Sequence, residues 1–225
     1  MINKKPAFLI IIILLVSSCS LYSQYFKLQP AVVHAVNVFF SVEKLKGKDA
    51  MKVIKDSAVE ASDQPTFVKI KGLDFKDGTI EVKVLSRLVK NAPEFARGFI
   101  GIAFRINNSD SQFECIYIRP TNGRAENQLR RNRSIQYFSY PDYDFERFRK
   151  EAPGQYESYA DMGLDEWITL KIVVKGATAR LFINNVTQPS LIVNDLKHGD
   201  SLSGSIGFWV DTGTEGYFSD LKVSN

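Results

Sequence analysis

A recurrence of large apolar residues at every second position is the feature that most constrains the fold of this 225-residue chain. Apolar side chains occupy every second position in the segments 80–84, 100–106 and 168–174. This period of two places the apolar side chains on one face of a β-strand, against a core. No window of a dozen residues shows the 3.6-residue period of a helix. The pattern therefore predicts an all-β protein.

Turn-forming residues separate these segments, at 77–78, 107–110, 175–176 and 184–185. The segment 167–185 is predicted to form a β-hairpin that turns at Lys175, Gly176 and Ala177. Many short strands at this spacing are typical of a two-sheet antiparallel sandwich or a jelly roll.

The sequence carries no internal repeat, low-complexity tract or Gly/Ser linker that would divide it further. All-β sandwiches of about this length form one domain. We therefore expect a single domain over residues 39–225, after a tether and first strand region at 19–38.

The N-terminus has the layout of a secretory signal, with Lys4 and Lys5 before an apolar run at 7–16 and small residues before Cys19. The apolar run is too short to span a bilayer, which takes about twenty residues. The cysteine at the cleavage point resembles the lipobox of bacterial lipoproteins. This resemblance implies a signal peptide at 1–18, a lipid anchor on Cys19, and a place in the bacterial cell envelope, at the outer membrane or facing the periplasm.

Loss of the signal would remove Lys4 and Lys5 and lower the formal charge from +4 to +2. The net charge then indicates no polyanionic partner. The only cysteines are Cys19 and Cys115. If Cys19 carries lipid, Cys115 has no partner, and it is expected to be a buried small hydrophobic residue in the apolar segment 113–118.

The order of the strand segments resembles the concanavalin A-like (laminin G-like) jelly rolls over about residues 66–223. The quoted segments are an opening strand, two following strands, a tryptophan-led hairpin and a closing pair: "FKDGTIEVKV", "FIGIAFRIN", "FECIYIRP", "EWITLKIVVKGATARLFINN" and "SGSIGFWVDTGTEGYFSDLKV". Within that superfamily the chain is similar to bacterial lipoproteins near the 3-keto-disaccharide hydrolase domain. The resemblance implies a carbohydrate partner and leaves two functions open: a glycoside hydrolase of that type, or a non-catalytic lectin-like or structural envelope lipoprotein.

The carboxylates do not settle whether the protein is an enzyme. Glycoside hydrolysis usually needs two carboxylates, and the Glu-x-Asp-x-x-Glu motif of retaining jelly-roll glucanases is absent; the corresponding strand offers only Glu114. The nearest counterpart of a Glu-x-Gln segment typical of the keto-disaccharide hydrolases is 126–128. The remaining candidates could be catalytic or could pair with nearby arginines, and they are Asp142, Asp144, Glu146, Glu157 and Asp161.

Other chemistries find little support. The two histidines, His34 and His198, are far apart in sequence and offer no His/Cys cluster for zinc. Calcium is common in the superfamily that the chain resembles, so Ca²⁺ is a candidate cofactor with Asp110, Asp211 and Asp220 as ligands, although aspartates in turns are ordinary.

The segment 130–149, "RRNRSIQYFSYPDYDFERFR", holds five arginines and six aromatic residues. Bases of single-stranded nucleic acid stack on rings, but an export signal and the nearby acids argue against a nucleic acid partner. Two interpretations stay open: a loop that packs its rings and pairs its own charges, and a sugar site. A hydrogen bond to a charged group is worth about 1.5–3 kcal/mol, and the arginine fork suits the carboxylate of an acidic sugar.

The alternation predicts where such a site lies. If Ile116 and Ile118 face the core, Cys115, Tyr117 and Arg119 face the opposite way. The segment 121–162, read as a long loop without regular structure, is expected to cover this face and to be functional. Trp209 shares the phase opposite the core and is either a sugar platform or a packing residue. The predicted groove has Arg105, Tyr117 and Arg119 on its floor, and the full candidate set is Arg105, Tyr117, Arg119, Asn122, Arg124, Tyr137, Tyr140, Tyr143 and Trp209.

Overall fold

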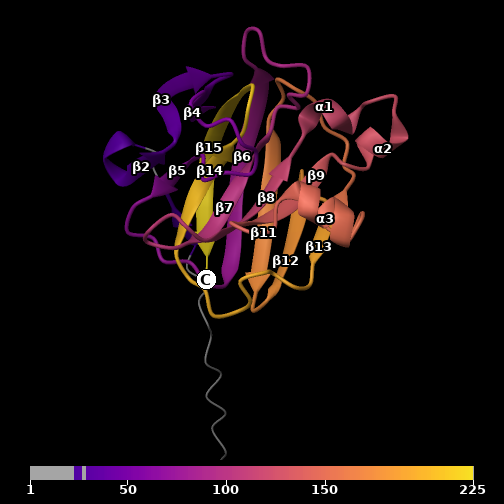
Figure 1. Cartoon of the computed structure of the whole chain (residues 1–225). Helices are drawn as coiled ribbons and strands as arrows, with labels where there is room; N and C mark the ends of the chain where they lie inside the picture. The colour runs from indigo at the N-terminus through magenta and orange to yellow at the C-terminus, as the bar shows by residue number, and fades with distance from the viewer. Residues whose placement is uncertain (1–22, 27–28, 225) are drawn as a thin grey trace, which may run out of the picture.

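The computed structural model of the chain describes residues 23–26 and 29–224 (Figure 1). The predicted signal peptide and the predicted anchor Cys19 lie outside the described residues. Among the described residues, no helix combines the length and the apolar character that crossing a membrane requires.

The strands form two antiparallel sheets, which we call sheet A and sheet B. The strands of sheet A are, in spatial order, β13 (Leu191–Val193), β12 (Thr178–Ile183), β11 (Ile168–Lys175), β6 (Gly78–Leu88), β15 (Thr214–Ser224), β4 (Lys48–Lys55) and β3 (Val38–Leu45), with β1 (Ser23–Tyr25) paired to β15. The strands of sheet B are β10 (Glu157–Ser158), β9 (Ile135–Tyr140), β8 (Phe113–Ile118), β7 (Ile100–Ile106), β14 (Ser205–Val210), β5 (Phe67–Ile70) and β2 (Val33–Val36). The predicted all-β, two-sheet antiparallel sandwich is confirmed.

The main core lies between the two sheets and is built from the alternating positions. Ile80, Val82 and Val84 of β6 contribute to it, as do Ile116 and Ile118 of β8. The predicted hairpin is also present, because β11 and β12 pair from Leu170↔Ile183 to Lys175↔Thr178. Burial of this shared apolar face is the main favourable contribution to folding.

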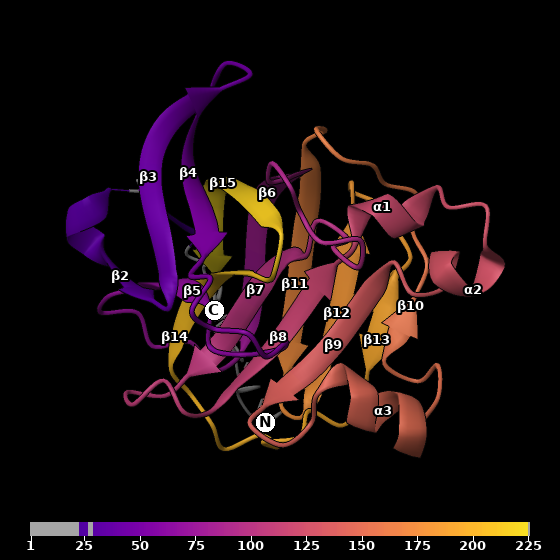
Figure 2. The ribbon, with the colours of Figure 1, turned by 45° about the horizontal axis from the view of Figure 1, so that its top comes forward.

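Four short helical segments complete the fold of the described residues: η1 (Pro30–Val32), α1 (Pro120–Gly123), α2 (Gln128–Arg131) and α3 (Phe145–Glu151). Side chains cap the N-termini of two of them, since Asn127 accepts from the backbone N–H of Arg130 and Asp144 from that of Arg147. Figure 2 shows α1, α2 and α3 on the β9 side of the molecule, away from the projecting β3–β4 hairpin.

The outer face of sheet B is also buried. Cys115, Tyr117 and Trp209 belong to a second apolar cluster there, together with Phe67 and Phe138. The predicted phase of Cys115 and Tyr117, opposite the core residues of their strand, is confirmed. Burial also raises the pKa of the Cys115 thiol well above its usual value, which suits a packing role.

The cover over part of this face differs from the prediction. The connection between β4 and β5, residues 56–66, lies over Trp209, whose indole Nε1 donates to the carbonyl of Gln64 at 2.9 Å. The segment 121–162 is not a structureless loop, because it contains α1, α2, β9, α3 and β10. The sequence hid β9 because its residues, "IQYFSY", are buried on both faces and do not alternate in polarity.

The placement of Arg105 was predicted wrongly. The pairing of β14 with β7 shifts register between Ser205 and Gly207, and Arg105 has φ of 54°. A bulge of this kind inserts a residue and changes the side-chain phase of the strand. The Arg105 side chain is fully buried at the end of β7, where it donates to the carbonyl oxygens of Lys76, Gly176 and Gly199.

Candidate functional site

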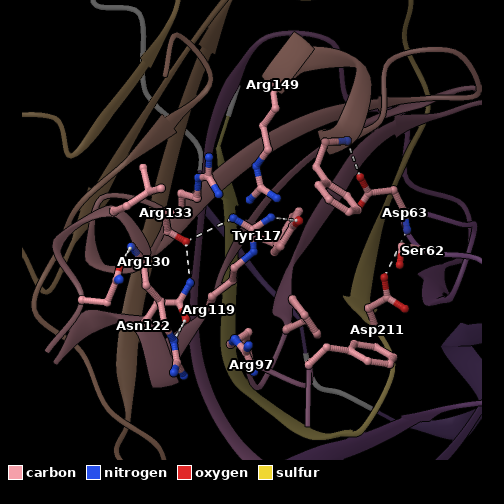
Figure 3. Close-up of a pocket in the computed structure, with 15 residues that line it drawn as sticks. Ser62, Asp63, Arg97, Tyr117, Arg119, Asn122, Arg130, Arg133, Arg149 and Asp211 are labelled. Atoms are coloured by element: carbon pink, nitrogen blue, oxygen red, sulfur yellow. Dashed lines mark hydrogen bonds between the residues drawn. The ribbon is translucent and has the colours of Figure 1, made fainter. Parts of the chain in front are cut away.

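A cavity of about 510 Å³ opens beside the end of β8, where connections from both sheets converge (Figure 3). This volume is within the range of small-molecule sites. Its lining residues come from five segments of the chain and are Ser62, Asp63, Phe95, Arg97, Phe99, Tyr117, Arg119, Asn122, Asn127, Leu129, Arg130, Arg133, Phe145, Arg149 and Asp211.

The floor of the cavity is Tyr117 with Arg119. Arg119 Nη2 donates to the Tyr117 hydroxyl at 2.6 Å and to Gln136 Oε1 at 3.1 Å, and its Nη1 donates to the carbonyl of Arg133 at 3.1 Å. The guanidinium carbon also lies 4.9 Å from the centre of the Tyr117 ring. Burial raises the pKa of Tyr117 well above its usual value, so this hydroxyl stays protonated. These contacts fix both side chains in one geometry.

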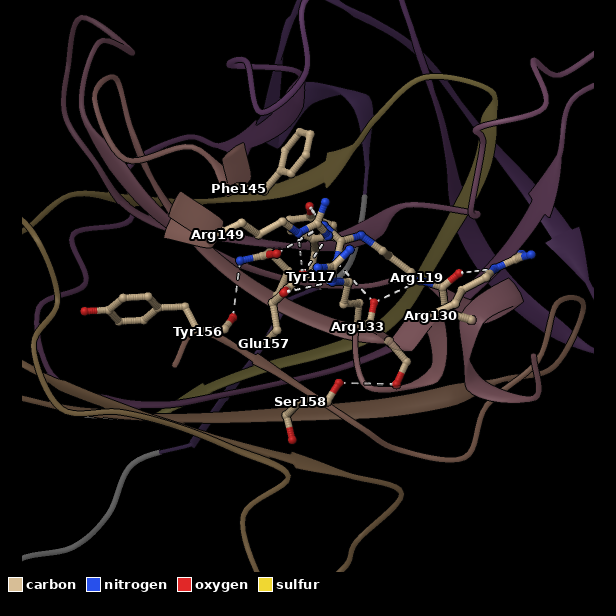
Figure 4. Close-up of polar contacts among 12 residues, drawn as sticks. Tyr117, Arg119, Arg130, Arg133, Phe145, Arg149, Tyr156, Glu157 and Ser158 are labelled. Carbon is tan, nitrogen blue, oxygen red and sulfur yellow. Dashed lines mark hydrogen bonds and ion pairs between the residues drawn. The ribbon is translucent and has the colours of Figure 1, made fainter. Parts of the chain in front are cut away.

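Five arginines line the cavity. Three of them, Arg119, Arg133 and Arg149, share a single carboxylate, Glu157 of β10 (Figure 4). Glu157 Oε1 lies 2.6 Å from Arg149 Nη2 and 3.3 Å from Arg119 Nη1, while its Oε2 lies 3.3 Å from Arg133 Nε. One negative charge therefore faces three positive charges. Glu157 and Asp161, which pairs with Arg124, behave as the loop-pairing interpretation expected.

The other two arginines of the cavity, Arg97 and Arg130, have no carboxylate partner among residues 23–26 and 29–224. Arg97 donates through Nη1 to the carbonyls of Glu94 and Ala96. Arg130 donates to Asn122 Oδ1 at 2.8 Å and to Thr121. Arg97 and Arg130 therefore carry positive charge into the cavity without an ion-pair partner, and only the charge of Glu94 acts on Arg97 from a longer distance.

Apolar side chains line the same cavity. Phe95 and Leu129 are 57% and 59% exposed, so they form open apolar surface at its edge. Deeper in the cavity, the ring of Phe99 packs edge-on against Tyr117 at 6.2 Å between centroids. Phe145 lies 4.8 Å from the guanidinium carbon of Arg149. The cavity thus combines apolar faces with charged donors.

Two carboxyl groups, Asp63 and Asp211, lie together on one side of the cavity, with Arg130 and Arg133 on the other side (Figure 3). Asp211 is fully engaged, because its oxygens accept from Lys55 Nζ, from Thr212 and from the backbone N–H of Asp63. Asp63 Oδ2 accepts from the backbone N–H of Phe145 at 2.8 Å. Asp63 therefore connects the 56–66 segment to the first residue of α3.

Burial raises the pKa of Asp63 from its ordinary value of 3.8 to about 7. The hydrogen bond from Phe145 and the charge of Arg119 oppose this rise, and the charges of Asp211 and Asp144 add to it. Asp63 is therefore the group of the cavity that changes its charge near neutral pH.

The cavity brings together three of the nine predicted ligand residues, Tyr117, Arg119 and Asn122. Tyr117 and Arg119 share a face as the alternation predicted. The Asn122 side chain donates to the carbonyl of Arg133 and accepts from Arg130, so it joins the two arginine-bearing stretches of this wall.

The other six predicted residues do not line the cavity. Arg105 is at the other end of β7, and Arg124 forms exposed ion pairs with Asp161 and Glu166. Trp209 is fully buried and packs 4.7 Å from Tyr117, which is the packing alternative.

The side chains of the three tyrosines predicted as ligand residues pack outside the cavity. Tyr137 belongs to the main core and donates its hydroxyl to Glu114 Oε2 at 2.7 Å. Tyr140 stacks on Phe113 at 5.2 Å, and the Tyr143 ring packs against Phe148 at 5.7 Å. Period-two reasoning could not place these side chains, because β9 is buried on both faces and Tyr143 lies in a turn.

The residues that the sequence did not single out come from distant connections. Phe95 and Arg97 precede β7, and the left-handed Gly98, at φ of 72°, turns the chain into that strand. Asp63 comes from the connection between β4 and β5. Besides the strand alternation at Tyr117 and Arg119, the arginine-rich composition of 130–149 pointed to this site, since Arg130, Arg133 and Arg149 all belong to it.

The candidate calcium ligands have other partners. Asp110 pairs with Lys69, Asp211 with Lys55, and Asp220 with Lys48 and Lys83. In the part of the chain that the structure describes, no three His, Cys, Asp or Glu residues group to hold a metal ion.

No protein-family model and no curated protein sequence matches this chain. Solved structures do match its fold. A carbohydrate-binding module, CBM66, from Bacillus subtilis has a TM-score of 0.57 at 13% identity over 86% of this chain and 96% of that chain. A protein of unknown function with a galectin-like fold from Bacillus subtilis has a TM-score of 0.54 at 11% identity over 90% of this chain and 94% of that one.

A β-glucanase from Bacillus licheniformis has a TM-score of 0.50 at 10% identity, over 90% of this chain and 98% of that chain. At these identities the likeness concerns the fold alone. It confirms the predicted fold class, a two-sheet antiparallel sandwich of the concanavalin A-like jelly-roll kind.

Proposed function

We propose that this protein is a lipid-anchored lipoprotein of the bacterial envelope that binds a glycan in the cavity at the end of β8. The observation that carries the proposal is the composition of that cavity: five arginines beside the open apolar side chains Phe95 and Leu129. Saccharides present apolar C–H faces and many hydroxyls, and a site of this composition matches both. The carbohydrate-binding module of similar fold supports the proposal.

A structural role without a ligand is the weaker alternative. Such a role would be favoured if the segment 121–162 filled the space over Tyr117 and Arg119. A cavity of about 510 Å³ stays open there instead, and two of its arginines, Arg97 and Arg130, keep donors that no described residue accepts from.

Processing of the glycan, as in the 3-keto-disaccharide hydrolases that the sequence resembles, is a second candidate. Asp63 favours it, because a buried carboxyl with a pKa of about 7 suits a general acid. Glycoside hydrolysis usually requires a second carboxylate. The other carboxylate of the cavity, Asp211, is already held by hydrogen bonds from Lys55, Thr212 and Asp63, so it is not available for this role. We therefore place binding ahead of hydrolysis.

A glycan array with the full chain in detergent tests the proposal, followed by analysis of the products from any bound saccharide. Phe95→Ala should weaken binding of every ligand found, because it removes open apolar surface from the cavity. Phe39→Ala is the matched control, since Phe39 is 64% exposed on β3 and does not line the cavity. Equal binding by Phe95→Ala and the wild type would show that the saccharide does not bind in this cavity. Cleaved products would favour the hydrolase.

A further inference from the structure

We infer that Arg97 and Arg130 form an anion subsite, at which the cavity holds the carboxylate or sulfate group of an acidic saccharide. This inference rests on the proposed function and names the class of ligand. Five arginines and two aspartates line the cavity. One of the aspartates, Asp211, pairs with Lys55.

The arginines fall into two groups that differ in their counter-ions. Arg119, Arg133 and Arg149 converge on Glu157, which holds them in place and leaves them little freedom to turn to a ligand. Arg97 and Arg130 form no ion pair within the described parts of the chain, although the charge of Glu94 acts on Arg97 from beyond ion-pair distance. The positive charge that remains available is therefore concentrated on these two.

Both side chains also keep unused donors. Arg97 uses only Nη1, and Arg130 uses Nε and Nη2, so Nε and Nη2 of Arg97 and Nη1 of Arg130 have no acceptor among the described residues. The Nε–Nη2 fork of Arg97 matches two oxygens of a carboxylate or sulfate group, and Nη1 of Arg130 offers a further donor to the same group. The contacts that they do make, to Ala96, Glu94, Asn122 and Thr121, hold the two guanidinium groups in position before a ligand arrives.

The two guanidinium groups act on each other. Burial lowers the pKa of Arg97, the charges of Arg130 and Arg119 lower it further, and the charge of Glu94 opposes this shift without cancelling it. Like charges that line one cavity repel, and an anion that binds both removes the repulsion while it gains hydrogen bonds from each. The arrangement is thus more favourable with an acidic group bound than without one.

An apolar side chain accompanies each of these arginines along the chain. Exposed Phe95 lies two residues before Arg97, and exposed Leu129 lies directly before Arg130. Phe95 with Arg97, and Leu129 with Arg130, therefore each offer an apolar surface for a sugar ring and a nearby donor for its charged substituent. A free inorganic anion would use only the arginines, whereas an acidic saccharide would use both.

Calorimetric titration of the full chain in detergent compares four probes: an oligogalacturonate, its methyl ester, a sulfated galactan oligosaccharide and inorganic sulfate. The wild type should bind one or both acidic oligosaccharides at least about tenfold more tightly than the methyl ester, the scale of one hydrogen bond to a charged group. Inorganic sulfate should bind more weakly than either oligosaccharide. Arg97→Gln and Arg130→Gln should each remove most of this preference and leave binding of the ester nearly unchanged.

Arg180→Gln is the control of equal charge, because Arg180 is exposed on β12 of the other sheet. A melting curve for each variant verifies folding, and two independent variants guard against the failure of one. Equal affinity of the methyl ester and both acidic oligosaccharides, or equal loss of acid and ester binding in the variants, would overturn the anion subsite and leave glycan binding standing. Tighter binding of free sulfate than of the oligosaccharides would likewise overturn it. Failure of every saccharide, on the array as well as here, would overturn the proposed function and this inference together.

Discussion

Substitution of Asp63 by asparagine should make the protein more stable at alkaline pH. Asp63 is buried beside Asp211, and burial raises its pKa to about 7 from 3.8. Because the folded-state pKa lies above the unfolded one, the folded state favours the protonated form. Its stabilising contribution is complete below about pH 3.8 and is lost as the pH rises through about 7.

The size of the effect follows from the two pKa values. At about 1.36 kcal/mol for each pH unit, ionisation of Asp63 costs up to ~4 kcal/mol above pH 7. An asparagine side chain cannot ionise, and its oxygen can still accept from the backbone N–H of Phe145, as Asp63 does at 2.8 Å. The Asp63→Asn variant should therefore match the wild type near pH 4 and exceed it by up to ~4 kcal/mol at pH 8.

Urea unfolding of both full chains at pH 4, 6 and 8 measures this difference. Asp74→Asn is a matched control, because Asp74 is exposed and does not line the cavity beside the end of β8. The stability of this variant should follow that of the wild type at each pH. A constant difference at all three pH values, or an Asp63→Asn protein less stable than the wild type at pH 8, would refute the reasoning.

Three further predictions concern single arginines and the anchor. Arg119→Ala should lower the free energy of unfolding, measured by chemical unfolding, by ~1.5–3 kcal/mol, the scale of hydrogen bonds to a charged group. The loss should not reach the ~3–5 kcal/mol of an unpaired buried charge, because Glu157 keeps two other arginines. Arg105→Ala should cost at least ~3 kcal/mol in the same assay, since it leaves three backbone carbonyls without their donor, yet glycan binding by the folded fraction should not change. Cys19→Ser should move the protein from the membrane fraction to the soluble fraction, because firm attachment needs several lipid chains, and retention of the variant in the membrane fraction would rule out the lipid anchor.

The fold was predictable because burial imposes a period on the sequence. Wherever one face of a strand meets the core and the other meets a more polar setting, as at 79–84 and 168–174, the alternation shows directly which side chains turn inward. The same rule placed Tyr117 opposite Ile116 and Ile118. It failed for β9, which is buried on both faces, and for Arg105, where a bulge inserts one residue that no local pattern marks.

The site was predictable only in part, because it is assembled from connections that are distant in the sequence. The arginine-rich stretch drew attention to the correct wall. Composition could not show that Tyr137 and Phe148 turn into the core while Phe145 and Arg149 turn to the cavity. Nor could it show that Phe95, Arg97 and Asp63 come to face them, since that proximity depends on how the two sheets pack.

A crystal structure of the protein with the tightest-binding acidic oligosaccharide is the most direct test of the account. We predict that a sugar ring lies in the cavity against Phe95, and that its carboxylate or sulfate accepts hydrogen bonds from Arg97 and Arg130. A saccharide bound at another surface of the molecule, with this cavity empty, would contradict the account.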